Sequence, residues 1–247
     1  MCTLAVAVRT DRRWPLVVAA NRDERLSRPA EGWALRDAPG APRYAAPRDA
    51  LAGGTWIGLS ARGLFAAVTN FHAPAAWVPD PARRSRGHLV GLALARPTAA
   101  AAREALAPLA ADAFNPFHLV VADGASAFLW RWDGESAAWE ALGPGLHVVT
   151  ERSPSGRCPR GDLLRARWPL DPTPARLREL LSLHADAAPG GAETCIHGEP
   201  VYGTRSSAVL RVAQDLGSTE LYASEGPPCT APLEDQSRLV AALARSA

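Results

Sequence analysis

The first 24 residues constrain the fold more than any other stretch of this chain. Two short apolar runs, residues 4–8 (LAVAV) and 16–20 (LVVAA), flank a polar segment that contains one aspartate and three arginines. Two β-type runs joined by a turn signal predict a hairpin. Antiparallel pairing returns the end of the second strand to the start of the first. We therefore expect Asn21 and Asp23, which follow the second run, to lie close to residue 2.

Cys2 is the most distinctive residue of this hairpin. Removal of the initiator Met would leave Cys2 with a thiol and a free α-amine, whose pKa values lie near ~8.5 and ~8. Such an amine can act as general base for its own side chain. Asp23 would hold the amine, and Arg22 or another cation would stabilise the thiolate. The alternative interpretation is that Cys2 is a small apolar residue at the start of a buried strand.

A second hairpin is expected within residues 53–71 (GGTWIGLSARGLFAAVTNF). Residues 55–59 and 64–71 are strand-like, and Gly63 in the turn between them is suited to a positive φ. Asn70 ends an otherwise apolar strand. Its carboxamide could donate a hydrogen bond to an oxyanion, which favours a catalytic role. It could equally cap the backbone of the following loop.

Composition excludes several classes of function. The chain has 247 residues, of which 47% are hydrophobic, and its formal net charge is only +2. This apolar content excludes a disordered chain, and the charge gives no case for a nucleic-acid partner. All 27 basic residues are arginine, so a lysine nucleophile or Schiff base is excluded.

The cysteines and the apolar runs bear on metals and on location. Cys2, Cys158, Cys195 and Cys229 are widely spaced with no Cys-x-x-Cys pair, which predicts neither a zinc site nor a disulfide framework. Polar residues interrupt the first apolar run before a signal peptide could form. No run reaches the ~18 residues of a membrane-spanning helix. We therefore expect a cytoplasmic protein with no metal and no integral membrane segment.

The order of elements predicts an α+β fold with antiparallel sheets, in a single domain over residues 1–247. Residues 25–51, rich in Pro and Arg, are expected to form a long, mostly irregular excursion, and short edge strands within it are left open. Ser85 and Thr98 are expected to cap two helices. The further elements are helices at 86–95, 99–109, 161–168, 173–184 and 233–244, a four-stranded meander at 117–122, 127–132, 137–142 and 146–150, and strands at 208–213 and 220–224.

Four stretches together resemble one family. They are Met1-Cys2-Thr3, residues 19–24 (AANRDE), residues 53–71 and residues 202–207 (YGTRSS). The pattern is similar to that of the NRDE family, also called the transport and Golgi organisation protein 2 family. That resemblance implies the N-terminal nucleophile hydrolase superfamily and its αββα four-layer sandwich.

Within that superfamily the pattern is most similar to the bile-salt and penicillin V acylases, which cleave linear amide C–N bonds. The resemblance implies that Cys2 is the nucleophile, that Asp23 holds the free amine and that Asn70 stabilises the oxyanion. Arg205 matches a late arginine near the active site. No cofactor is required for such a reaction, and the partner would be a small acyl substrate. The residues expected to contact that substrate are Asn21, Arg22, Glu24, Trp56 and Glu151.

One departure from the family pattern keeps a second function open. Glu151 stands where the acylases carry Asn, and a carboxylate cannot donate to an oxyanion unless it is protonated. Its charge would also raise the pKa of a nearby thiol. Relatives are associated with haem trafficking and with lipid or acyl-CoA handling. The alternative is therefore a non-catalytic carrier in which haem is a cargo, with one of six histidines or Cys158-Pro159 as a contact.

Overall fold

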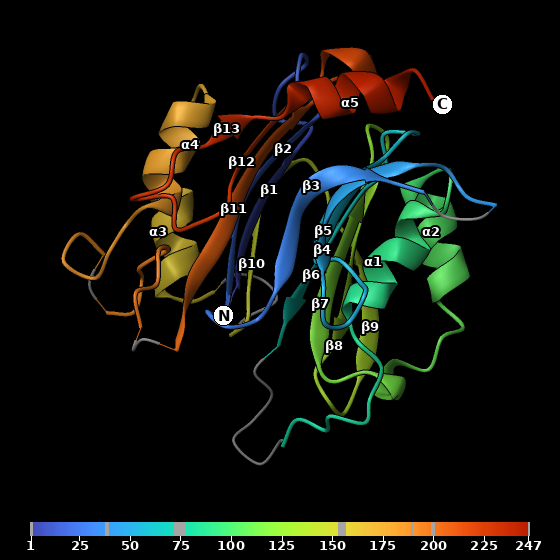
Figure 1. Cartoon of the computed structure of the whole chain (residues 1–247), viewed down its shortest axis with the longest axis horizontal. Coiled ribbons are helices and arrows are strands. Elements are labelled where there is room, and N and C mark those ends of the chain that lie inside the picture. Colours follow the sequence, from blue (N-terminus) through green and yellow to red (C-terminus); the bar gives the residue numbers. More distant parts are fainter. Residues whose placement is uncertain are drawn as a thin grey trace.

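The computed structural model describes residues 2–37, 40–71, 78–152, 157–188, 190–198 and 201–246. Within these ranges the strands form two antiparallel sheets, one of six strands and one of seven. The sheets lie face to face, with helices on both outer faces (Figure 1). This arrangement confirms the α+β sandwich, with its antiparallel sheets, that the resemblance implied.

Each sheet draws on strands from distant parts of the chain. The six-stranded sheet has the order β10 (Gly145–Thr150), β1 (Cys2–Val8), β2 (Leu16–Arg25), β11 (Tyr202–Val212), β12 (Glu220–Ser224) and β13 (Glu234–Asp235). The seven-stranded sheet runs in chain order through β3 (Ala30–Arg36), β4 (Tyr44–Asp49), β5 (Ile57–Ser60), β6 (Phe65–Asn70), β7 (Phe117–Ala122), β8 (Ala127–Trp132) and β9 (Ala137–Ala141). The first sheet therefore joins both ends of the chain.

The helices complete the four layers. They are α1 (Gly87–Leu94), α2 (Ala99–Leu106), α3 (Pro159–Arg167), α4 (Pro174–Leu181) and α5 (Ser237–Ala244). Figure 1 shows α3 and α4 outside the six-stranded sheet, α1 and α2 outside the seven-stranded sheet, and α5 across one end. In the described part of the chain, no helix is long and apolar enough to cross a membrane.

Side-chain alternation along the strands divides the apolar residues among the layers. Leu4, Val6 and Val8 of β1 pack between the two sheets, whereas Ala5 and Ala7 face α3 and α4. In β6, Phe65 and Ala67 face the space between the sheets, and Ala66 and Val68 face α1 and α2. Successive residues of a strand point to opposite faces, so a strand buried on both faces becomes a nearly continuous apolar run.

The N-terminal hairpin has the predicted pairing but a longer second strand. Cys2 lies opposite Arg22 and Thr3 opposite Asn21. Strand β2 continues through Asp23 to Arg25, so the polar residues belong to the strand and do not merely follow it. These polar residues adopt strand conformation because β11 pairs with the same segment of β2 on the side away from β1.

Two expectations about local structure were wrong, and a third was right in part. Residues 25–51 do contain edge strands, β3 and β4, which form one edge of the seven-stranded sheet, but the stretch is less irregular than expected. Strand β10 does not extend the meander, because it leaves β9 and pairs with β1 in the other sheet. Ser85 makes no cap, since α1 starts after Arg86 with no side-chain cap hydrogen bond. Thr98 does cap α2, accepting from the Ala101 N–H at 3.1 Å.

Two glycines bring the start of α1 against the loop before β5. A Cβ on Gly54 would lie 2.6 Å from the carbonyl carbon of Gly87, and a Cβ on Gly87 would lie 3.0 Å from the Thr55 carbonyl oxygen. Both obstacles are backbone atoms, so neither can move aside cheaply. This close approach sets the position of Arg86, the residue just before α1.

We expect Gly54→Ala to destabilise the protein by about 1–3 kcal/mol, the range for overpacking a closely packed site. Gly91→Ala in α1 is the matched control, because a Cβ there meets nothing within 4 Å. That control should be neutral or stabilising by up to about 1 kcal/mol, since alanine favours helix over glycine. Urea unfolding of the three proteins measures both effects. Equal midpoints for wild type and Gly54→Ala would contradict the close approach.

Candidate active site

Cys2 begins β1 with its thiol on the face that looks toward the second sheet. Directly opposed residues of an antiparallel pair share a face, and Cys2 is opposite Arg22. The side chain is 8% exposed, and its Sγ lies 3.9 Å from the carbonyl oxygen of Asp23. The buried thiol lies at the end of the sandwich, where a cavity adjoins it.

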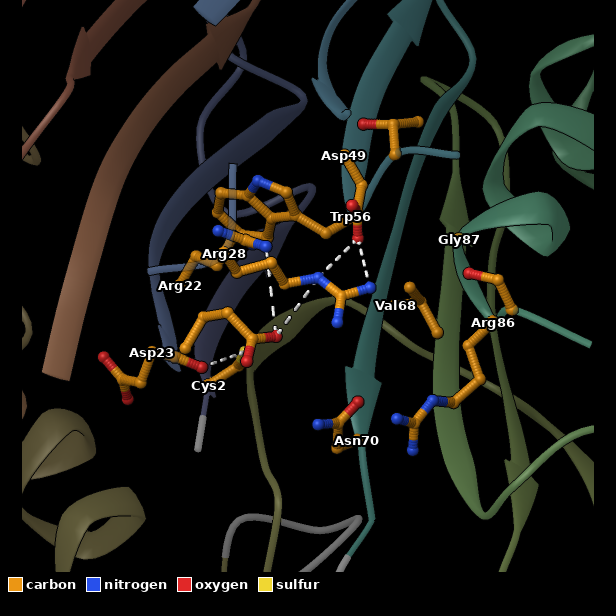
Figure 2. A pocket seen from close by; sticks show the side chains of 13 residues that line it. Cys2, Arg22, Asp23, Arg28, Asp49, Trp56, Val68, Asn70, Arg86 and Gly87 are labelled. Carbon is orange, nitrogen blue, oxygen red and sulfur yellow. Dashed lines mark hydrogen bonds and ion pairs between the residues drawn. The ribbon is translucent and has the colours of Figure 1, made fainter. Parts of the chain in front are cut away.

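A cavity of about 110 Å³ adjoins this thiol. Its walls come from β1 and β2 on one side and from β4, β6 and the start of α1 on the other (Figure 2). Asn70 and Arg86 lie across the cavity from Cys2. Among the described residues, no hydrogen bond engages the Asn70 amide, which leaves it available to a ligand. The full lining is Cys2, Arg22, Asp23, Glu24, Arg28, Asp49, Thr55, Trp56, Val68, Asn70, Ser85, Arg86 and Gly87.

The cavity lining carries three arginines and three acidic residues, which are Arg22, Arg28, Arg86, Asp23, Glu24 and Asp49. Arg28 contacts Asp49 at 2.7 Å, and Arg22 and Glu24 lie 3.9 Å apart. Arg86 donates to the Pro116 carbonyl oxygen at 3.0 Å and, among the described residues, forms no ion pair. Burial lowers the pKa of Arg86 from its usual value. Because Arg22 and Arg28 are paired with Glu24 and Asp49, Arg86 is the cation of the lining best placed to bind an anion.

The Cys2 thiol is protonated at neutral pH in this setting. Burial raises its pKa, the charge of Asp23 adds to the rise and the charge of Arg22 opposes it. A neutral thiol is a weak nucleophile. Nucleophilic chemistry at Cys2 therefore needs a general base, and among the described residues that line the cavity there is no histidine.

The carboxylate of Asp23 points to the other face of β2, away from the thiol. Thr204 of β11 donates to Asp23 Oδ1 at 2.6 Å. Burial raises the pKa of this carboxyl to about 6, although the Thr204 hydrogen bond and the charge of Arg160 lower it. Asp23 thus meets the cavity through its backbone, and its carboxylate lies beside the start of β1 on the side of α3 and α4.

Asn21 and Glu151 belong to this second face and do not line the cavity. Asn21 Nδ2 donates to the carbonyl oxygens of Leu181 and Thr194 at 2.9 and 2.8 Å. Glu151 is fully buried and pairs with Arg160 at 3.3 Å. The charge of Glu151 is therefore compensated, and it is not among the causes of the raised Cys2 pKa. The predicted conflict between Glu151 and a reactive thiol does not arise.

Arg205 lies in a neighbouring cavity of about 40 Å³. Its guanidinium donates to the carbonyl oxygens of Leu26 and Arg28, and so supports the segment that carries Arg28. Arg22, Asp49 and Trp56 line both cavities. Of the residues predicted for the site, Cys2, Arg22, Glu24, Trp56 and Asn70 line one cavity. The carboxylate of Asp23 lies on the opposite face of β2, against Thr204.

Sequence reasoning missed four residues of the site. Arg28 and Asp49 come from the stretch predicted to be irregular, and Arg86 precedes a helix whose packing on Gly54 could not be foreseen. Thr204, which donates a hydrogen bond to Asp23, lies in the YGTRSS motif. Its place in that motif was the one sequence signal that could have identified it as a site residue.

The family comparison agrees with this architecture. Residues 1–169 match the model of the family Transport and Golgi organisation 2. The chain therefore belongs to that family. No curated protein matches the sequence.

Solved structures of N-terminal nucleophile hydrolases share the fold. The C2A mutant of conjugated bile acid hydrolase from Clostridium perfringens aligns with a TM-score of 0.56 at 10% identity, over 96% of this chain and 93% of that one. The N-acylethanolamine-hydrolyzing acid amidase ortholog of Caenorhabditis elegans gives 0.57 at 14%, over 85% and 92%. Penicillin V acylase from Agrobacterium tumefaciens gives 0.54 at 13%, over 91% and 83%. At these identities the likeness shows the fold alone.

Proposed function

We propose that this protein is a cysteine-dependent N-terminal nucleophile amidohydrolase that cleaves the linear amide C–N bond of a small acyl substrate. One observation carries the proposal: the thiol at the start of β1 borders a cavity lined by Arg22, Arg28 and Arg86, with the Asn70 amide opposite. The three structural neighbours support it by their names, which are those of a hydrolase, an amidase and an acylase.

The proposed reaction requires removal of Met1. The α-amine of Cys2 takes the thiol proton, and the sulfur attacks the amide carbonyl carbon. The resulting oxyanion accepts a hydrogen bond from Asn70. The ammonium then returns its proton to the leaving amine as the C–N bond breaks, which leaves a thioester on Cys2. Water, deprotonated by the same amine, hydrolyses the thioester and restores the thiol.

In this scheme Asp23 positions the amine and not the thiol. Its carboxylate lies on the face of β2 opposite the Cys2 side chain, and the backbone nitrogen of residue 2 is at the free end of β1. A carboxylate there would orient the amine and favour its charged form after proton transfer. Thr204 in turn fixes the carboxylate through its 2.6 Å hydrogen bond.

The cavity also indicates the substrate. Arg86, which has no acidic partner among the described residues, suits an acyl amide that carries a carboxylate or another anionic group. A volume of about 110 Å³ is below the ~300–1,000 Å³ of sites for drug-sized ligands. A short acyl group fits that space. The haem or lipid carrier stays a prediction of the family resemblance, and it would require a ligand that extends outside this cavity.

We expect Asp23→Asn to separate activity from stability. The variant should lose most amide hydrolysis, on the order of 10²-fold or more, because the amine is no longer oriented. At pH 7.5 it should be more stable than wild type by up to about 3 kcal/mol, because the folded-state pKa of about 6 exceeds the ordinary aspartate pKa of 3.8. That carboxyl favours the folded state only below pH ~4, and the contribution is lost as the pH rises through 6.

Urea unfolding of wild type and Asp23→Asn at pH 4 and pH 7.5 measures this difference, with hydrolysis assayed on the same preparations. The stability gain should vanish at pH 4. Asp162→Asn is the matched control, because Asp162 lies in the first turn of α3 and is exposed. Unchanged hydrolysis in Asp23→Asn would contradict the assigned role of this carboxylate.

A further inference from the structure

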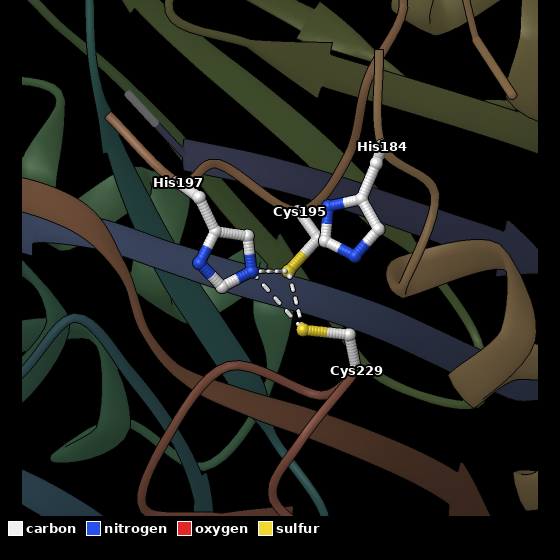
Figure 3. A group of neighbouring side chains, drawn as sticks. All are labelled: His184, Cys195, His197 and Cys229. Carbon is white, nitrogen blue, oxygen red and sulfur yellow. Dashed lines mark hydrogen bonds between the residues drawn. The ribbon is translucent and has the colours of Figure 1, made fainter. Parts of the chain in front are cut away.

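Four potential metal ligands from three separate segments meet near the end of α4. His184 follows α4, Cys195 and His197 precede β11, and Cys229 lies in the loop between β12 and β13. Their ligand atoms all lie within 4.8 Å of one another. Figure 3 shows the two imidazole rings and the two thiols converging on one point.

The measured separations suit a single small ion. Cys195 Sγ lies 3.6 Å from Cys229 Sγ and 3.6 Å from His197 Nε2, and His197 Nε2 lies 3.1 Å from Cys229 Sγ. Zinc binds thiolates at ~2.3 Å and imidazoles at ~2.0–2.1 Å, so a regular tetrahedron places neighbouring ligand atoms ~3.3–3.8 Å apart. The ring of His184 lies with its centroid 4.9 Å from that of His197 and supplies the fourth corner.

We propose that His184, Cys195, His197 and Cys229 form a tetrahedral zinc site. Two thiolates and two imidazoles are a ligand set that zinc prefers, and four protein ligands leave no open position. The site is therefore structural and not catalytic. Binding releases the two thiol protons to solvent and leaves the oxidation states of sulfur and metal unchanged.

The surrounding backbone holds the ligands in place. The N–H groups of Thr194 and Cys195 both donate to the Leu183 carbonyl oxygen at 3.0 Å. Thr194 Oγ1 donates to the Leu180 carbonyl oxygen at 2.5 Å, in the last turn of α4. The segment that bears Cys195 is thus fastened beside His184. Within an extended segment, residues two apart share a face, which lets Cys195 and His197 reach the same ion.

The same segment leads directly to the candidate active site. The Ile196 N–H donates to Thr204 Oγ1 at 2.8 Å, and Thr204 Oγ1 donates to Asp23 Oδ1 at 2.6 Å. An ion that fixes Cys195 and His197 therefore fixes the residue between them, which helps to orient Asp23. This consequence rests on the proposed function, whereas metal binding itself does not.

The expectation of no metal came from the spacing of the cysteines, and the structure gives reason to revise it. The four ligands occur as His-x10-Cys-x-His-x31-Cys, which matches no finger-type pattern. Only the packing of α4 against the six-stranded sheet brings His184 to the other three. The short Cys-x-His pair was the one local signal.

The test measures zinc in the full-length, untagged protein purified from zinc-supplemented medium under reducing conditions. Elemental analysis should give about one zinc per chain for wild type. Cobalt in place of zinc should give the intense visible bands of a tetrahedral ion and a thiolate-to-cobalt charge-transfer band. A strong chelator should lower the Tm of wild type by roughly 10 °C, and added zinc should restore it.

Cys195→Ser, Cys229→Ser and His184→Gln should each lose most of the zinc. Cys158→Ser and His88→Gln are the matched controls, because neither residue belongs to the cluster, and both should retain it. The cobalt spectrum and the chelator melt use wild type alone, so they decide the question even if a variant fails to fold.

Three results would overturn the proposal. They are a zinc content in wild type no higher than in Cys229→Ser, a cobalt spectrum without thiolate charge transfer, or a Cys195–Cys229 disulfide in the reduced, metal-supplemented protein. Loss of hydrolysis in the zinc-free protein with retained zinc binding in wild type would support both assignments. Zinc bound by a protein with no hydrolase activity would support the metal site and contradict only the proposed function.

Discussion

Cys2→Ala is expected to abolish amide hydrolysis while leaving the fold intact. The variant removes the only thiol that borders the candidate cavity among the described residues. Loss of a covalent nucleophile lowers kcat by factors on the order of 10⁴ or more. Cys2 is a small side chain at a strand end, so its truncation should change the free energy of unfolding by about 1 kcal/mol or less. Turnover of a panel of linear N-acyl amino acids and N-acyl amines measures the first effect, and urea unfolding measures the second.

Cys158→Ala is the matched control for this experiment. Cys158 is half-buried at the start of α3, where its sulfur contacts Thr150 Oγ1 at 3.5 Å. It lies outside the cavity, so this variant should retain wild-type turnover. Equal turnover by Cys2→Ala and wild type would show that Cys2 is not the nucleophile.

Acidification is expected to destabilise the protein strongly through His118. This residue of β7 is fully buried beside Phe71, with ring centroids 4.8 Å apart. Burial lowers its pKa to about 3, and the charge of Arg131 adds to that effect. The unfolded chain binds this proton near pH 6.5, whereas the folded chain does not, so stability falls as the pH drops below 6.5. By pH 4.5 the loss should reach about 3 kcal/mol.

His118→Gln should remove this part of the pH dependence, because glutamine does not titrate. The stability difference between variant and wild type should therefore shift by about 3 kcal/mol in favour of the variant between pH 7.5 and 4.5. Comparing two proteins at each pH cancels the opposite contribution of Asp23, which both retain. His88→Gln is the control, since His88 is exposed near Ala52. Parallel pH profiles for His118→Gln and wild type would contradict the burial of a neutral imidazole.

Local pattern was enough to predict the two hairpins that frame the site. Alternation and turn residues placed Asn21 and Asp23 close to residue 2 and set Asn70 at a strand end, because both features depend on neighbours in the chain. The helices at 161–168 and 173–184 were also found near α3 and α4, which cover residues 159–167 and 174–181. Pro174 does occupy the first turn of α4.

Features that depend on long-range packing could not be predicted. Strand β10 follows a regular meander, yet it is the exposed edge of β1 that decides its partner. Residues 25–51 were predicted to be mostly irregular because Pro and Arg interrupt the alternation of apolar residues. In the structure β3 and β4 nevertheless pair at the sheet edge. Asp23 faces the side of β2 opposite the thiol because a strand alternates, and the sequence did not show that the polar residues continue β2. The cluster at Cys195 depends on three separate segments meeting in space.

Intact mass and peptide mapping of the protein, quenched in acid during turnover of an acyl amide, test the central claim most directly. We predict a chain that lacks Met1 and carries the acyl group on Cys2 alone. An active protein that retains Met1, or an acyl group on any other residue, would contradict the claim that the first thiol and its own amine perform the reaction.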